Sequence, residues 1–115
     1  MNTVTIVGRV GRDASEDYKS FESGKTKARF SVAVNRWDSK LKEEVTDWYN
    51  IEVWDKQAEF AYNYVKKGRQ VVIDGAIANN RWTDKATNEE KESFFIRANT
   101  IKLLGSRNDA DNSAA

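Results

Sequence analysis

The sequence predicts an all-β fold with one short helix, in which five strands close into a Greek-key barrel. Three observations support this prediction. Apolar and polar residues alternate along five stretches, which is the pattern of strands that are buried on one side. One stretch, between the third and fourth strands, has the helical period instead. Polar segments separate these elements, and 115 residues suffice for one domain with its own core.

The first strand is expected over residues 2–10, where Val4, Ile6 and Gly8 share one face. The opposite face is mostly polar. Because a glycine inside a strand often marks a bulge or bend, we expect one at Gly8. Residues 11–24 are polar with few large apolar groups, and they are predicted to form a connection that contains a short irregular strand.

The second strand is expected over residues 26–36, where apolar side chains occupy every second position. Trp37 follows with the parity of the polar face, so its indole should emerge outside the barrel beside Arg36. The charged run over residues 38–46 is predicted to be an exposed loop or hairpin tip.

The third strand, residues 47–54, places Tyr49, Ile51 and Val53 on an apolar face that looks like core. The other face carries two indoles together with an amide and a carboxylate: Trp48, Asn50, Glu52 and Trp54. This combination is unsuited to a core but suited to a surface that stacks on flat ligands.

Residues 55–67 are predicted to form the helix, with Asp55 capping its start and Gly68 ending it. Its apolar stripe consists of Phe60, Ala61, Tyr64 and Val65. A fourth strand runs over residues 71–78, with Val71, Ile73, Gly75 and Ile77 on one face. If extension persists, Trp82 lies opposite the core, next to Arg81, and a polar tip covers residues 83–92.

The fifth strand, residues 93–104, has three consecutive apolar residues, so its two faces are left unassigned. The resulting order of three strands, a helix and two strands is that of the OB-fold, a five-stranded Greek-key barrel. Another small antiparallel barrel or an α+β sheet is the alternative. The OB-fold domain is expected over residues 1–104, and residues 105–115 are expected to be a disordered tail.

Composition excludes most catalytic classes. Cysteine and histidine are absent, which removes zinc fingers, thiol nucleophiles, catalytic triads and an imidazole base. The adjacent pairs Glu43–Glu44 and Glu89–Glu90 fall in expected loop tips, where solvated charge is the simpler interpretation. We therefore expect no enzyme, no metal and no cofactor. No apolar run approaches the ~20 residues of a membrane span, and a soluble, cytoplasmic protein is expected.

The four tryptophans, Trp37, Trp48, Trp54 and Trp82, all have non-core parity. Stacking on aromatic side chains contributes ~1 to 3 kcal/mol per base regardless of sequence, so they predict a surface for single-stranded nucleic acid. Nearby cations could contact phosphates: Arg36, Lys40, Lys56, Arg81 and Lys85, with Lys66, Lys67 and Arg69 near the helix end. The net charge of +1 gives no global signature, and an ordinary solvated surface is the alternative.

The segments NTVTIVGRVGRD, FSVAVNRW, TDWYNIEVWDKQAEFAYNYVKKGRQV and DGAIANNRWTD together resemble the bacterial single-stranded DNA-binding proteins over residues 2–104. The resemblance implies a homotetramer of OB-folds that wraps single-stranded DNA in replication, recombination and repair, located at the nucleoid, with an organelle also open. It assigns base stacking to the four tryptophans. The family's phosphate contacts fall at Lys40, Lys56, Lys67 and Arg81 of this chain, and its subunit contact falls at Val4, Ile6 and Tyr49.

This chain departs from the family pattern at several places. Asn50 and Asn80 stand where the family is often basic, which predicts lower affinity or salt resistance. The family's acidic C-terminus with an apolar tip, which recruits replication and repair proteins, is absent from the ending NDADNSAA, so the chain is either truncated or a variant without that recruitment. A dimeric OB-fold adaptor of the primosomal kind, acting mainly through protein contacts, is the alternative function.

Overall fold

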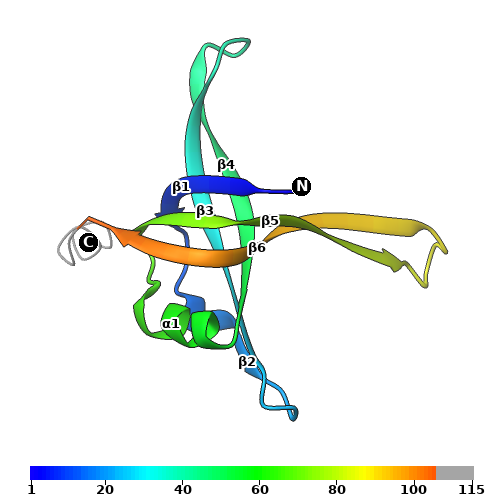
Figure 1. The fold of residues 1–115 in the computed structure, drawn as a ribbon. Helices are drawn as coiled ribbons and strands as arrows, with labels where there is room; N and C mark the ends of the chain where they lie inside the picture. The colour runs from blue at the N-terminus through cyan, green and yellow to red at the C-terminus, as the bar shows by residue number, and fades with distance from the viewer. Residues whose placement is uncertain (106–115) are drawn as a thin grey trace.

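The computed structural model describes residues 1–105. Its elements are β1 (Val4–Val10), the 3-10 helix η1 (Ala14–Asp17), β2 (Tyr18–Ser20), β3 (Thr26–Asp38), β4 (Glu43–Trp54), α1 (Lys56–Tyr64), β5 (Gln70–Thr83) and β6 (Glu90–Leu104). Figure 1 shows the long strands crossing at steep angles, with α1 beside one end of the barrel. The predicted tail lies, from residue 106 onward, outside the described residues.

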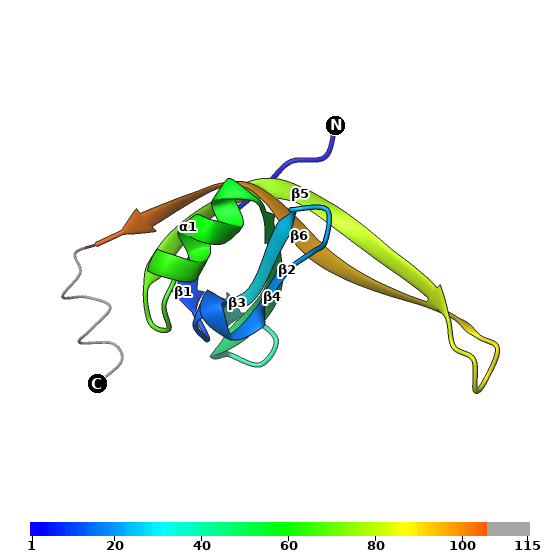
Figure 2. The same ribbon diagram turned by 90° about the horizontal axis from the view of Figure 1, so that it is seen from below.

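The long strands form a closed barrel. Their order in the sheet is β1-β5-β6-β4-β3, with the short β2 at the edge of β3, and a further pairing of β1 with β3 closes the ring. Only the β4–β6 pairing is parallel among the described strands, with Ile51 opposite Ile96. Because α1 lies between β4 and β5, the third and fourth long strands, the predicted OB-fold is confirmed. Figure 2, which views the molecule from below, shows α1 at the same end of the barrel from a second direction.

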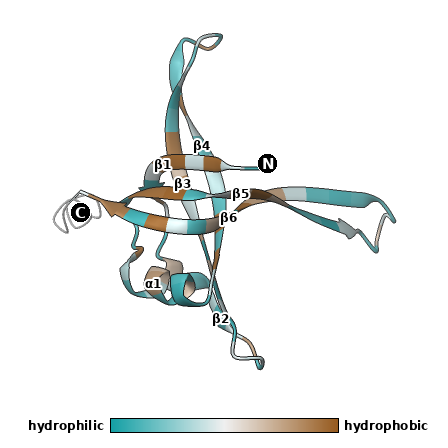
Figure 3. Cartoon of the chain, viewed as in Figure 1, coloured by the Kyte–Doolittle hydropathy of each residue, from teal (hydrophilic) through white to brown (hydrophobic). Residues whose placement is uncertain are grey.

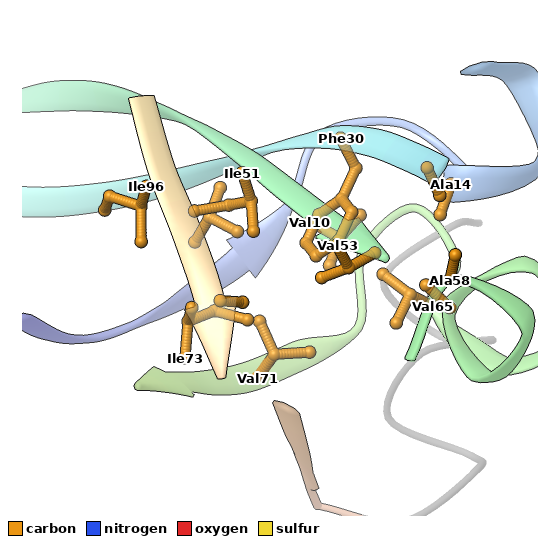
Figure 4. Close-up of a cluster of buried hydrophobic side chains, with 14 residues drawn as sticks. Val10, Ala14, Phe30, Ile51, Val53, Ala58, Val65, Val71, Ile73 and Ile96 are labelled. Carbon is orange, nitrogen blue, oxygen red and sulfur yellow. The ribbon is translucent and has the colours of Figure 1, made fainter. Parts of the chain in front are cut away.

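The core is filled by the alternating residues that the sequence pattern predicts. Phe30, Val32, Ile51, Val53, Val71 and Ile73 are all buried. The end of the core next to α1 is closed by small side chains, of which Figure 4 labels Ala14, Ala58 and Val65. The predicted helix stripe is confirmed except at Tyr64. Ala61 and Val65 are buried and Phe60 packs against the core, but Tyr64 is exposed.

The predicted helix caps are right only for the position of Asp55. It is the N-cap residue of α1, and its carbonyl accepts the Glu59 N–H at 3.0 Å, but its side chain makes no hydrogen bond to the helix. Its φ is 53°, and its Oδ1 accepts a hydrogen bond of 3.2 Å from the Thr26 N–H. Asp55 therefore ties the end of β4 to the start of β3. The helix ends at Tyr64, so Gly68 lies beyond it. With φ of 87°, Gly68 forms the turn into β5 and donates its N–H to the Val10 carbonyl at 2.8 Å.

Two hairpin arms extend beyond the barrel, and the strands that form them are longer than predicted. The tips cover only residues 39–42 and 84–89, because β3, β4, β5 and β6 all continue through the polar segments that were expected to be loops. Figure 3 shows that the arms are largely hydrophilic while the barrel strands carry the hydrophobic residues. A two-stranded ribbon exposes both faces, so its sequence has no alternating pattern to reveal it. Ile77, expected in the core, is likewise exposed where β5 leaves the barrel.

The expected bulge also lies elsewhere. The pairing of β1 with β5 runs through Gly8 without a register shift. Gly8 instead allows a close approach, because a Cβ there would clash with the Ala33 carbonyl and lie 2.7 Å from Val32 Cγ1. The irregularity falls in the β5–β6 pairing between Asp74 and Gly75.

Candidate nucleic-acid interface

The four tryptophans lie outside the core, as their parity predicts. Trp37, Trp48 and Trp82 are 65%, 61% and 45% exposed. Trp54 is half-buried, because Phe21 stacks against it with ring centroids 5.8 Å apart and an angle of 22° between the planes. Large exposed indoles are costly for solubility, so three exposed indoles and a half-buried fourth, all outside the core, indicate a binding surface.

These indoles are divided between the barrel and the arms. Trp48 and Trp54 lie on the barrel part of β4, where Trp48 pairs with Ala33 and Trp54 with Lys27 of β3. Trp37 lies near the tip of the β3–β4 arm, opposite Glu44. Trp82 lies near the tip of the β5–β6 arm, where it lines a hollow of about 440 Å³ together with Arg81 and Glu92. The predicted surface therefore extends from one arm across the barrel to the other.

Trp48 lies directly over the backbone of Gly11. A Cβ at Gly11 would come within 2.5 Å of the indole Cζ3 and within 2.8 Å of Ser31 Oγ. The N–H of Gly11 donates to the Ser31 carbonyl at 2.9 Å, which fixes the backbone at this position. Gly11 was predicted only to lie in a connecting segment, because nothing local in the sequence reveals a ring that comes from β4.

Two predicted cations are paired with carboxylates. Arg36 Nε lies 2.6 Å from Asp47 Oδ2, and Arg36 Nη1 lies 3.5 Å from Asp38 Oδ2. The hydrogen bond and charge of Asp47 raise the pKa of Arg36, so its charge is fixed at every physiological pH. Arg81 Nε lies 3.0 Å from Glu92 Oε2. Both pairs are exposed, and a phosphate can replace the carboxylate at modest cost.

The predicted lysines are distributed unevenly. Lys40 and Lys85 lie in the tips of the two arms, and Lys56 begins α1 immediately after Trp54. No ion pair of these three side chains occurs within residues 1–105, so they are available to a phosphate. Lys67 lies in the turn that follows α1, three residues beyond its end at Tyr64.

A central cluster was missed. Glu52, predicted to lie on an exposed face, is only 4% exposed. Lys27 Nζ lies 3.9 Å from its Oε1, and Arg97 Nη2 lies 3.9 Å from its Oε2. The Lys27 Nζ also lies 5.6 Å from the Trp54 ring centroid and 5.8 Å from that of Phe21. These residues come from distant segments, and only the strand register brings them together.

The residues predicted for a subunit contact border an apolar groove. Val4, Ile6 and Tyr49 are half-buried and pack against the core cluster. Val4 and Tyr49 line a groove of about 260 Å³, whose wall also includes the exposed side chains of Trp48, Ile77 and Phe94. A groove of this kind fits another apolar surface, but the contact between subunits stays a prediction.

Catalytic and membrane features are not evident in residues 1–105. No group of three or more acidic residues in this part of the chain is arranged to hold a metal ion. The two adjacent glutamate pairs lie in or beside the exposed arms. Within the same residues, no helix has the length and hydrophobicity to span a bilayer.

Known proteins share both the sequence and the fold. A model of the "Single-strand binding protein family" matches residues 1–104. "Single-stranded DNA-binding protein 1" of a Nostoc species is 43% identical over 111 residues, which cover 96% of this chain and 89% of that protein. The "Single-stranded DNA-binding protein" of Thermosynechococcus vestitus is 40% identical over 114 residues, which cover 99% and 91%. A solved structure, "Plasmodium falciparum SSB complex with ssDNA", has a TM-score of 0.77 and 28% identity, covering 91% of this chain and 96% of that chain.

Proposed function

Because this chain belongs to the single-strand binding protein family, we propose that it binds and protects single-stranded DNA without sequence preference and without catalysis. The observation that carries the proposal is the set of four indoles outside the core, three of them exposed, which are distributed over the barrel strand β4 and both arms. Every base has a π-face, so indoles placed in this way can stack on a strand of any sequence. Duplex DNA offers no free base faces and should bind weakly.

In this proposal Trp37, Trp48, Trp54 and Trp82 stack on bases, while cations follow the phosphates. Lys40, Lys56 and Lys85 contribute most per residue, because they have no carboxylate to release within the described chain. Arg36 and Arg81 contribute less, because a phosphate must first replace Asp47 or Glu92. Lys67 contacts DNA only if the strand passes beyond α1.

We also propose that four copies assemble through the surface that includes Val4, Ile6 and Tyr49, and that the assembly acts in replication, recombination and repair. The apolar groove beside these residues supports a contact between copies. Light scattering in solution measures this directly. A mass of two copies would instead favour the dimeric adaptor, and one copy would contradict the interface.

Titration with oligo(dT) tests the central proposal. Saturating oligo(dT) should quench most of the tryptophan fluorescence, because stacking brings bases against the indoles. The apparent affinity should fall with salt, with log K dropping roughly 0.7 per phosphate neutralised. A duplex of the same length is the control and should quench little. Unchanged emission at micromolar protein would reject the proposal, and a flat salt response would reject the cation assignments alone.

A further inference from the structure

Glu52 is the only charged side chain that is buried within residues 1–105. It lies on β4 between Asn50 and Trp54, on the face that carries the indoles. Burying a carboxylate is costly unless it is paired and hydrogen-bonded. Yet its Oε2 is shielded from solvent and accepts no hydrogen bond from the described residues. The Glu52 carboxylate is therefore a buried anion that lacks a hydrogen bond, and it lies on the surface proposed to bind DNA, which is itself an anion. This position requires an explanation.

Three cations surround this carboxylate. Arg29 of β3 and Arg97 of β6 are its direct partners in the strand register, one on each side. Lys27 lies two residues before Arg29 on β3. The distances from Glu52 to Lys27 and Arg97 are both 3.9 Å, longer than the ~2.7 to 2.9 Å of a charge-assisted hydrogen bond. The cluster is therefore positive overall, and its pairs to Glu52 are loose.

An aromatic pair lies next to the cations. Phe21, from the connection between β2 and β3, stacks on Trp54, and the Lys27 ammonium lies within 6 Å of both ring centroids. Phe21 is 41% exposed, so its ring is open to solvent on this side. Arg97 is 57% exposed and lies 5.7 Å from the ring of Phe95. Aromatic faces beside cations are what one nucleotide requires, a surface for its base and a charge for its phosphate.

We propose that this cluster is a nucleotide subsite in which the Phe21–Trp54 pair stacks on a base while Lys27 and Arg97 exchange Glu52 for a phosphate. In the free protein Glu52 stands in for that phosphate and balances part of the charge of both cations at 3.9 Å. When a strand binds, phosphate oxygens form the short hydrogen bonds that Glu52 does not, and the carboxylate repels them. Glu52 thus lowers the affinity for DNA. This inference rests on the proposed function and adds Phe21, Lys27 and Arg97 to the predicted contacts.

The test measures binding of a fluorescein-labelled oligo(dT) by anisotropy over a series of NaCl concentrations. Glu52→Gln keeps the shape of the side chain and removes its charge, so binding should tighten about tenfold and depend more steeply on salt. Arg97→Gln should weaken binding and reduce the slope of log K against log[NaCl] by about 0.7. Lys102→Gln is the matched control on the same strand, because Lys102 is exposed and outside the cluster, and it should change neither.

Phe21→Ala separates the base contact from the phosphate contact. It should weaken binding about 5- to 150-fold and leave the salt slope unchanged, because stacking releases no counterions. Phe21 and Arg97 are both exposed, so these two variants decide the matter even if Glu52→Gln fails to fold, which circular dichroism would reveal.

The outcomes distinguish this inference from the proposed function. Suppose that the unmodified protein binds oligo(dT), that Arg97→Gln has an unchanged salt slope, and that Phe21→Ala has an unchanged affinity. The proposed subsite is then wrong, and the proposed function stands. A folded Glu52→Gln that binds no tighter would show that Glu52 is a structural ion-pair partner only, and would overturn the exchange. If the unmodified protein does not bind oligo(dT), both proposals fall together.

Discussion

Replacing Gly11 by alanine should weaken DNA binding by displacing Trp48, although the Ser31 Oγ, 2.8 Å from the added Cβ, must shift as well. The added Cβ would lie 2.5 Å from the indole Cζ3, whereas ordinary contacts begin at 3.4 Å, so the ring must move by about 0.9 Å. Trp48 is exposed and free to move outward, and Gly11 has no positive φ that would exclude alanine. The fold should therefore tolerate the change, with a free energy of unfolding within about 1 kcal/mol of the original. The stacking of a base on the displaced Trp48 indole should be weaker.

The expected loss follows from the value of one stacking contact. Complete loss costs ~1 to 3 kcal/mol, which is about 5- to 150-fold in affinity, and a displaced ring keeps part of it. Gly11→Ala should therefore fall between the original protein and Trp48→Ala. A double-mutant cycle by anisotropy with labelled oligo(dT) provides the sharper test, because Gly11→Ala should have no further effect once Trp48 is alanine. Equal losses in both backgrounds would refute the link to the indole.

Two further predictions concern stability and titration. Phe30→Ala should lower the free energy of unfolding by about 3 to 5 kcal/mol in urea denaturation, because Phe30 is buried. Phe94→Ala is the control, and it should lower this free energy far less, because the Phe94 ring is exposed. Equal losses in the two variants would contradict the core assignment. Hydrogen bonds from the Leu41 and Lys40 N–H groups lower the pKa of Asp38, so the carboxylate stabilises the fold at neutral pH and loses this effect as pH falls through its folded pKa. A carbon NMR titration should give a midpoint below 3.8, and a midpoint above it would contradict the loop geometry.

The barrel could be predicted from sequence alone because each of its strands turns one face to a single apolar interior. Alternation located Phe30, Ile51 and Ile73 in the core, and the same parity placed the tryptophans outside. The pattern failed in the arms, where neither face is buried and polar residues look like loops. It also left the faces of β6 unassigned. The structure resolves them, with Ile96 and Ala98 buried and Phe94 exposed on the arm.

The missed parts of the site depend on contacts between distant segments. Glu52 looks like a surface residue because its neighbours in sequence alternate normally. It becomes buried because Arg97, 45 positions further along the chain, lies opposite it in register. The side-chain cap of α1 failed for the same reason, since the Asp55 carboxylate accepts its hydrogen bond from Thr26 rather than from the helix. Residue type and spacing carry no information on such pairings until the register is known.

The proposed binding surface has two parts that differ in rigidity, one on the barrel and one on the arms. Trp48 and Trp54 lie on β4, which pairs with β3 along its length and with β6 between the two indoles, and whose other face contributes Ile51 and Val53 to the core. Trp37 and Trp82 lie on two-stranded ribbons that extend beyond the core. Ribbons of this kind open locally at low free energy, so their amide hydrogens should exchange well before those of the barrel. A strand that reaches the arms must pay the entropy of ordering them. Bases on the barrel should thus be held more tightly than bases on the arms, and the outer contacts can adjust to the path of the DNA while the central ones cannot.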